Sequence, residues 1–245
     1  MKKALAALAA TAIVSACGRG GGDSTPATPS AAQGLWIGTT TANRTVTGLV
    51  FSDGSYYVLY SRVGNPAVIG GVVQGGSSAS AGTWTSGDAK DFNLEGAGVL
   101  SASLAGTYIA KQSLGGTVTY ANGSATTFSG AYNTAFEAAP SLSAVSGFYS
   151  GTVALSQGSQ VATISVASSG AVSANANGCI ATGTATPRTD ANAYNLVLTF
   201  GPAPCFFAGQ TFTGIAYFDA AAKRLYAAAP NAARTDGVLF VGTKP

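Results

Sequence analysis

Three acidic residues of the first half lie close together in the sequence, Asp88, Asp91 and Glu95. Two carboxylates about 5–9.5 Å apart can hydrolyse glycosides, but in an extended strand Asp91 and Glu95 would lie about 13 Å apart on one face. A carboxylate from a neighbouring strand would be needed to complete such a pair. The spacing also lacks the Asp-x-Asp-x-Asp-Gly pattern of a calcium loop. We therefore expect these acids to face water, while Phe92 and Leu94 of the same segment pack inward.

Histidine is absent from the 245-residue sequence. Its absence excludes Ser-His-Asp hydrolysis, histidine general-base catalysis, haem ligation by histidine and most zinc sites. The Gly-x-Ser-x-Gly elbow and the Ser-x-x-Lys motif are also absent, and the glycines within residues 70–76 are not followed by the Gly-Lys-Ser/Thr of a P-loop. The sequence therefore predicts a protein that is not an enzyme and that has no cofactor and no metal site.

The N-terminus has the layout of an export signal. Two lysines follow Met1, an apolar run of about eleven residues follows them, and the run leads into the tetrapeptide Val14–Cys17. Because a helix that spans a bilayer takes roughly 20 residues, the run fits a signal peptide over residues 1–16 that is removed. An ordinary secretory signal with an incidental cysteine is the alternative.

The tetrapeptide Val14–Cys17 resembles the lipobox of bacterial lipoproteins, in which small residues precede a modified cysteine. This resemblance implies that Cys17 carries fatty-acid chains, palmitate among them, that hold the mature protein on a membrane. Two or more such chains bind durably, because each buried methylene contributes about 0.8 kcal/mol. Gly18 stands where the family places aspartate for retention in the inner membrane, which implies the outer membrane.

Residues 17–33 are rich in Gly, Ser, Thr and Pro and lack apolar periodicity, so we expect a flexible tether. Removing the two leader lysines leaves ten basic against nine acidic residues, a formal charge of +1 in place of +3. A chain with a net charge this close to zero does not attract nucleic acid by electrostatics. Charged residues make up 9% of the sequence, against about 25% in typical soluble domains, which predicts a neutral, hydrogen-bonding surface.

The rest of the chain contains an internal repeat. Residues 34–39 (GLWIGT) and 147–152 (GFYSGT) share an aromatic between two glycines and lie 113 residues apart. Two further matches follow at similar offsets, residues 50–54 with 166–170 and 128–130 with 240–242. Three matches in the same order predict a duplication.

Both halves consist of short alternating runs separated by Gly, Asn, Asp and Ser, the pattern of antiparallel strands. Closure into a barrel would remove the exposed edges of such strands. We therefore predict an all-β fold of two tandem small antiparallel barrels, over residues 34–133 and 147–245, with a linker over 134–146 that contains a short helix. The predicted strands are 35–41, 45–51, 55–61, 67–74, 80–85, 90–95, 99–110, 114–121, 125–132, 148–155, 160–167, 170–174, 178–186, 193–200, 206–218, 223–229 and 237–243.

Cys179 and Cys205 are the cysteines that remain beside Cys17. The compartment beyond the inner membrane is oxidising, so we expect a disulfide between them. A redox-active dithiol would need the Cys-x-x-Cys spacing, which is absent.

Three tyrosines lie close together at Tyr56, Tyr57 and Tyr60. Strand alternation puts Tyr56 and Tyr60 on one face and Tyr57 with Leu59 on the other, so we expect at least one set near the surface. Exposed tyrosines on a rigid sheet suit recognition of a partner. The alternative is that they cap a barrel core with their hydroxyl groups in water.

The whole chain resembles outer-membrane lipoproteins of Gram-negative bacteria and, more distantly in its layout, the transferrin-binding and complement-factor-binding surface lipoproteins. This resemblance implies a noncatalytic binding or interaction module that is anchored to the outer membrane by lipid and faces either the host or the periplasm. Its partner would be a host or envelope protein and not nucleic acid. The Gly-x-Trp of residues 34–36 resembles the opening motif of lipocalin barrels, which implies the alternative of a periplasmic-side carrier for a small apolar ligand. An enzyme that uses carboxylates ranks third.

Overall fold

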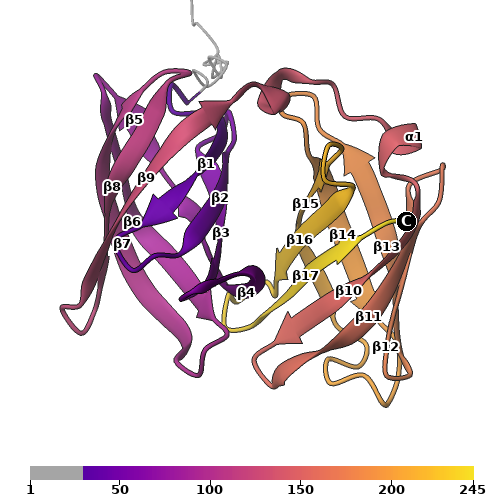
Figure 1. Ribbon diagram of the computed structural model, residues 1–245. Helices are drawn as coiled ribbons and strands as arrows, with labels where there is room; N and C mark the ends of the chain where they lie inside the picture. Colours follow the sequence, from indigo (N-terminus) through magenta and orange to yellow (C-terminus); the bar gives the residue numbers. More distant parts are fainter. Residues whose placement is uncertain (1–29) are drawn as a thin grey trace, which may run out of the picture.

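The computed structural model describes residues 30–245, which form two closed antiparallel barrels side by side (Figure 1). Barrel 1 comprises β1 (Gly34–Thr40), β2 (Thr45–Val50), β3 (Ser55–Arg62), β4 (Asn65–Gly76), β5 (Ser78–Ser80), β6 (Thr83–Asn93), β7 (Gly98–Ile109), β8 (Ser113–Tyr120) and β9 (Ala125–Asn133). Barrel 2 comprises β10 (Gly147–Leu155), β11 (Gly158–Val166), β12 (Ala171–Ala176), β13 (Cys179–Pro187), β14 (Tyr194–Phe200), β15 (Thr211–Asp219), β16 (Arg224–Pro230) and β17 (Gly237–Thr243).

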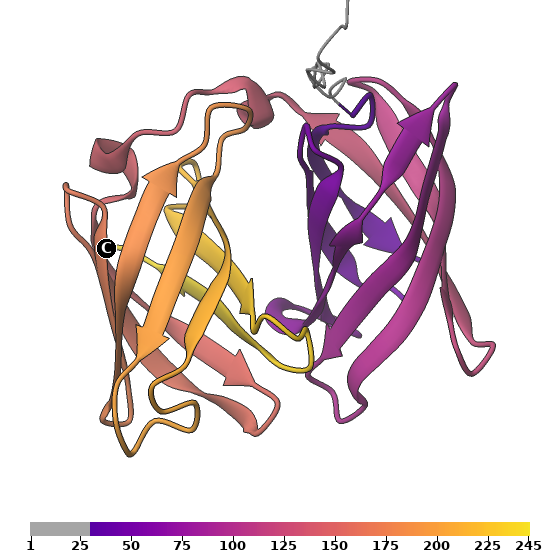
Figure 2. The same ribbon diagram turned by 180° about the vertical axis from the view of Figure 1, so that it is seen from behind.

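In each barrel the first strand pairs with the last, β1 with β9 and β10 with β17. In barrel 1 the order is β4-β3-β2-β1-β9-β8-β7-β6, and β4 pairs with β6 to close the ring, while the short β5 pairs with β6 beside it. In barrel 2 the strands follow chain order and β10 pairs with β17. The prediction of an all-β fold with two small antiparallel barrels is confirmed, and both views in Figures 1 and 2 show the barrels as separate rings.

Two strand predictions were wrong in detail. The runs predicted at 80–85 and 90–95 belong largely to one strand, β6, which continues through an irregularity between Ser86 and Ala89 where its pairing with β7 shifts. The bulge adds one residue to β6 and breaks the sequence alternation, so that one strand looks like two. The strand predicted from residue 206 begins at Thr211, because residues 201–210 form a loop.

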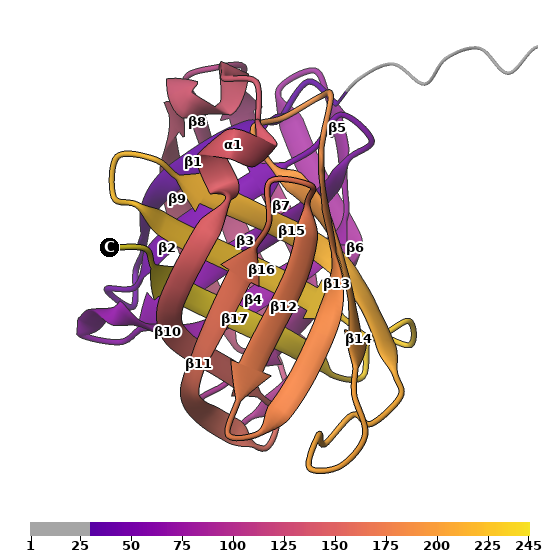
Figure 3. The same cartoon turned by 90° about the vertical axis from the view of Figure 1, so that its right-hand side faces the viewer.

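The linker between the barrels carries two short helical turns, η1 (Thr134–Glu137) and α1 (Leu142–Val145). The Ser141 side chain accepts from the Ala144 N–H as the N-cap of α1. Val145 packs into the core of barrel 2, so α1 covers that end of barrel 2 (Figure 3). Among residues 30–245 no helix is long and apolar enough to cross a membrane.

The repeated glycines lie where the first and last strands of each barrel meet. Gly38 of β1 is opposite Gly130 of β9, and Gly151 of β10 is opposite Gly242 of β17. A Cβ atom on Gly38 would lie 1.8 Å from a carbonyl oxygen of β9, and one on Gly151 would lie 2.1 Å from a carbonyl oxygen of β17. The same close backbone contact in both halves gives the internal repeat a structural cause.

Substituting either glycine should therefore destabilise its barrel. We expect Gly38→Ala and Gly151→Ala each to lower the free energy of unfolding by about 1–3 kcal/mol, because backbone must shift to admit the methyl group. Urea unfolding followed by fluorescence measures the change. Gly87→Ala is the control, since a Cβ there meets no atom within 4 Å, and equal effects at all three positions would contradict the role of the close contact.

The barrels pack on each other through two apolar clusters. The first interface cluster contains Leu35, Leu49, Phe51, Phe136, Ala191, Ala193, Ile215 and Tyr217. The second interface cluster contains Leu59, Val72, Phe92, Ala154, Ala228 and Leu239. Strands at the interface therefore have two buried faces, one toward the interior of their own barrel and one toward the other barrel.

Ion pairs flank these clusters. Arg234 in the β16–β17 loop of barrel 2 donates to the Asp88 carboxylate at 2.9 Å and to the Gln74 carbonyl oxygen at 2.7 Å. Asp190 of barrel 2 accepts from the Ser52 N–H and hydroxyl of barrel 1 at 3.2 and 2.6 Å, and from Arg188 at 2.8 and 3.0 Å. These contacts fix the barrels against each other at both sides of the interface.

Acid should weaken the contact at Asp190. Burial alone would raise the pKa of Asp190, but hydrogen bonds from Arg188 and Ser52 outweigh it and lower the pKa to about 2. The unfolded carboxyl titrates near about 3.9, so stabilisation is present above that pH and is lost as the pH falls through the folded pKa. We expect a loss of about 1–2 kcal/mol between about pH 4 and about pH 2, after allowance for solvent screening.

Urea unfolding at several pH values checks this prediction. Asp190→Asn should be less stable than the parent near neutral pH and should lose less stability in acid. Asp53→Asn serves as the control, because Asp53 bonds only within its own turn, to Ser55. If the parent and Asp190→Asn lost the same stability between about pH 4 and about pH 2, Asp190 would not be the group responsible for the loss.

Candidate functional site

The chain enters the structure at one end of barrel 1. The Ser30 N–H donates to the Ser52 carbonyl oxygen in the β2–β3 turn, and the Trp36 indole donates to the Ala32 carbonyl oxygen. The linker helices lie at this same end, whereas the β6–β7 and β8–β9 turns and the β14–β15 loop lie at the opposite end (Figure 1). We call this opposite end the mouth end.

Barrel 1 contains a cavity of about 260 Å³ that reaches toward the mouth end. Its polar wall includes Thr40, Arg44, Tyr60, Asp91, Asn93 and Tyr120. Its apolar wall includes Val46, Val58, Leu104, Val118 and Phe128. A hollow with few polar groups on an apolar background is the usual form of a small-molecule site, and its volume is close to the lower limit of about 300 Å³ for such sites.

Asp91 is the buried acid of this cavity, and it is only 1% exposed. One carboxylate oxygen accepts from the Tyr60 hydroxyl at 2.7 Å and the other accepts from the Tyr120 hydroxyl at 2.8 Å. Burial raises the pKa of Asp91, although the bonds from both tyrosines and the charge of Arg44 act in the lowering direction. Burial and the neighbouring Asp91 raise the pKa of Tyr60 and of Tyr120, so both phenols stay protonated and act as donors to the carboxylate.

Arg44 adds a positive charge to the wall of the same cavity, and Glu95 neutralises that charge. Its Nη1 lies 2.5 Å from an oxygen of Glu95 and donates to the Ser61 carbonyl oxygen at 2.8 Å. Its guanidinium carbon lies 5.2 Å from the centre of the Tyr60 ring. Arg44 is therefore held in place by an acid, a backbone carbonyl and an aromatic ring.

These positions correct the expectation for the acidic segment. Of the three acids, Asp91 points into barrel 1, while Asp88 binds Arg234 and Glu95 binds Arg44. Phe92 does not pack inward: it packs outward against barrel 2 in the second interface cluster. The predicted alternation at Asp91 and Phe92 is correct, but inside and outside are exchanged, because barrel 2 buries the outer face of β6 at Phe92.

Tyr56, Tyr57 and Tyr60 are not exposed recognition residues. Tyr56 is fully buried and Tyr60 is 8% exposed, both inside barrel 1, as expected for side chains on one face. Tyr57 packs at the interface between the barrels, beside both apolar clusters. The predicted alternation of this strand is correct, but both of its faces are covered.

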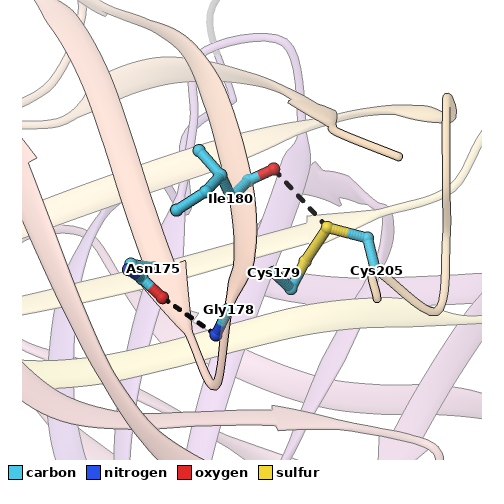
Figure 4. Close-up of a disulfide and its surroundings, with 5 residues drawn as sticks. All are labelled: Asn175, Gly178, Cys179, Ile180 and Cys205. Carbon is cyan, nitrogen blue, oxygen red and sulfur yellow. Dashed lines mark hydrogen bonds between the residues drawn. A yellow bond between two sulfur atoms is a disulfide. The ribbon is translucent and has the colours of Figure 1, made fainter. Parts of the chain in front are cut away.

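Barrel 2 is filled with side chains, and its interior cavity measures about 60 Å³ with an almost wholly apolar lining. Its mouth carries the loop of residues 201–210, which a disulfide between Cys179 and Cys205 joins to β13 (Figure 4). The Gly201 N–H also donates to the Ile180 carbonyl oxygen at 2.8 Å. At its other end the loop is held to β14, where the Gly209 N–H donates to the Phe200 carbonyl oxygen at 3.0 Å and the Phe200 N–H donates to the Gln210 carbonyl oxygen at 2.9 Å.

Phe206 projects from this loop and is 58% exposed, whereas the neighbouring Phe207 is buried. The two rings contact each other edge to face with centres 4.8 Å apart. Beside Phe206 lies a groove of about 290 Å³, lined by the loop and by the β10–β11 and β12–β13 turns. Phe206 is not among the residues predicted from the sequence, although its position beside Cys205 is a signal that points to it.

The other predicted site residue, Cys17, lies outside the described residues. Within residues 30–245 no three His, Cys, Asp or Glu side chains lie together as a metal site would require. The site is therefore described by the cavity of barrel 1 and by the Phe206 loop of barrel 2, both at the mouth end. Together they define a double-barrel protein with two hollows that open away from the point of chain entry.

Comparisons with known proteins found only weak structural similarity. The chain matches no protein-family model, and no curated protein matches it either. Among solved structures it is similar to the isotype 1 transferrin binding protein B from serogroup B Neisseria meningitidis, with 13% identity, a TM-score of 0.31, and coverage of 82% of this chain and 64% of that chain. It is also similar to a mutant of the transferrin binding protein B from Haemophilus parasuis Hp5, with 10% identity, a TM-score of 0.29, and coverage of 82% and 66%. The chain spans less than two thirds of the length of either structure.

Proposed function

We propose that the protein is a noncatalytic binding module of the outer membrane, held by lipid on Cys17, that binds a host or envelope protein with its mouth end. The observation that carries the proposal is the position of the mouth end. Phe206 is exposed there on a cross-linked loop, while residue 30, where the tether joins the fold, lies at the other end. A rigid exposed aromatic beside a groove is typical of an interaction site, because it offers contact area at low entropic cost.

The anchor is tested by metabolic labelling with palmitate in the native bacterium. The parent chain should be labelled and Cys17→Ser should not. The location is tested by treating intact cells with protease, which should release the barrels. Equal labelling of both chains would overturn the lipid anchor, and full protection of the barrels would overturn the surface location.

The binding face is tested by placing a photo-crosslinking amino acid at Phe206 in the full chain on intact cells. We expect covalent adducts with another protein from this position. Phe148 is the matched control, because it is 76% exposed but lies on β10, in the wall of barrel 2. Adducts at both positions in equal yield, or at neither, would contradict the assignment of the mouth end.

The cavity of barrel 1 supports small-molecule binding as a second candidate function. The alternative of a carrier for a purely apolar ligand does not fit the structure well. The cavity of barrel 1 is large enough for a small ligand, but its wall carries charged and hydrogen-bonding groups. The apolar cavity inside barrel 2 has a volume of only about 60 Å³. Any ligand of barrel 1 must therefore have polar groups that match this wall.

A further inference from the structure

We propose that the cavity of barrel 1 binds a small organic cation, an amine with an apolar group attached. This inference goes beyond the proposed protein-binding function and is independent of it. It is based on three features of the cavity: the hydrogen-bonding capacity of the two tyrosines, the charge of Asp91, and the apolar wall that faces them.

The tyrosine hydroxyl groups can only accept hydrogen bonds from a ligand. Each hydroxyl has a single hydrogen, and both hydrogens are donated to Asp91. The Tyr60 oxygen also accepts from the Asn93 amide at 3.2 Å, which leaves Tyr120 with the greater free capacity. Tyr120 is half-buried and lines the cavity. A ligand that meets this wall must bring N–H or O–H donors.

The charge of the wall also favours a cation. Among the described residues no Lys or Arg lies within ion-pair distance of Asp91, and the cation of the cavity, Arg44, is paired with Glu95. With both carboxyl groups ionised, the three charges sum to one negative charge. An ammonium group at the Tyr120 hydroxyl would supply the missing positive charge, and the low dielectric of the cavity would strengthen that attraction.

The remaining wall suits the body of the ligand. Val46, Val58, Leu104 and Val118 provide aliphatic surface, and Phe128 provides an aromatic ring. Burial of a hydrocarbon group against them contributes about 25 cal/mol per Å² of apolar surface. Aromatic faces also attract cations. The cavity therefore matches an amine with a compact alkyl or aryl group better than a simple metal ion or an inorganic ammonium ion.

The test compares three probes of similar shape and different charge: phenethylamine, 2-phenylethanol and phenylacetate. Each is titrated calorimetrically into the full lipidated chain in nanodiscs, with empty nanodiscs as the blank. We expect phenethylamine to bind at least tenfold more tightly than the alcohol and phenylacetate to bind most weakly. Phenylacetate binding as tightly as the amine would overturn the proposal and indicate an anion site at Arg44, and absence of amine binding at millimolar concentration would also overturn it.

Two variants locate the binding. Tyr120→Phe keeps the ring and removes the acceptor, so it should weaken binding of the amine about tenfold and binding of 2-phenylethanol less strongly. Asp91→Asn keeps the shape and removes the charge, so it should weaken amine binding about tenfold while leaving 2-phenylethanol nearly unchanged. Asp219→Asn, at the start of the β15–β16 turn of barrel 2, is the control and should bind as the parent does. Near-ultraviolet circular dichroism shows whether each variant is folded. If Asp91→Asn does not fold, Tyr120→Phe alone decides, and unchanged amine affinity in it would overturn the proposal.

Discussion

Replacing Phe92 by alanine should lower the free energy of unfolding by about 3–5 kcal/mol, the usual cost of removing a buried aromatic ring. Phe92 belongs to barrel 1, yet its ring is 4% exposed because it packs on Ala154, Ala228 and Leu239 of barrel 2. Removing it leaves a cavity between two bodies that each have a core of their own. The loss should therefore appear as weaker coupling between the barrels as well as lower stability.

The measurement follows each barrel separately during urea unfolding. Trp36 and Trp84 both lie in the core of barrel 1, so tryptophan fluorescence reports that barrel. Backbone circular dichroism reports both. In the parent the two transitions should coincide, and in Phe92→Ala they should separate, since loss of coincidence between probes marks a departure from two-state unfolding.

Phe148→Ala provides the matched control for Phe92→Ala. The same ring is removed, but from a side chain that is 76% exposed, so the change should stay within about 0.5 kcal/mol. If the two variants unfolded at the same urea concentration, the second interface cluster would not couple the barrels. Coincident transitions in Phe92→Ala at lower stability would show that the barrels unfold as one unit even without this ring.

The interface also explains which parts of the fold the sequence could predict. Alternation correctly placed Tyr56 with Tyr60 and Tyr57 with Leu59, because the period of a strand is a local property. It could not say which face is the inside. In a single barrel the outer face meets water, but the outer face of β3 at Leu59 and that of β6 at Phe92 meet the other barrel and are apolar there as well.

The acidic segment shows the same limit for the candidate site. Asp91 has the residue type of a solvent-facing position, and its burial depends on two partners, Tyr60 and Tyr120, that come from distant strands. Sequence separation gives no hint of that contact, because it depends on the register of β3, β6 and β8. The cavity is a product of the same register and was not predictable from composition.

The repeat and the cysteines were more informative, because each depends on a strong local constraint. Gly38 and Gly151 of the repeat mark places where two backbones approach too closely for a Cβ atom. The disulfide followed from the number of cysteines and their expected compartment. In both cases a single residue type meets a specific physical requirement, so the sequence alone was sufficient to predict the feature.

Removal of the disulfide should lower the free energy of unfolding of barrel 2 by about 3 kcal/mol, the chain-entropy value for a closed loop of this length. Cys179 and Cys205 are 26 residues apart, and the bond joins the β14–β15 loop to the start of β13. Cys179→Ala combined with Cys205→Ala removes it without leaving a free thiol. Tryptophan fluorescence from barrel 1 should shift less than backbone circular dichroism, because the lost restraint lies in barrel 2.

The same change should affect binding through the position of Phe206. After the disulfide is removed, the loop keeps backbone hydrogen bonds at its two ends, from Gly201 to β13 and between Phe200 and residues 209–210. The residues between these ends, Phe206 among them, gain freedom that a partner must then restrain. We expect adducts from a crosslinker at position 206 to fall several-fold in the double alanine variant, while adduct yield at Phe148 stays at its low level. A reducing agent applied to the parent should reproduce the loss of stability. If reduction left the unfolding midpoint unchanged, the disulfide would contribute no stability, and if adduct yield at position 206 were unchanged in the variant, the cross-link would not be what presents Phe206 to a partner.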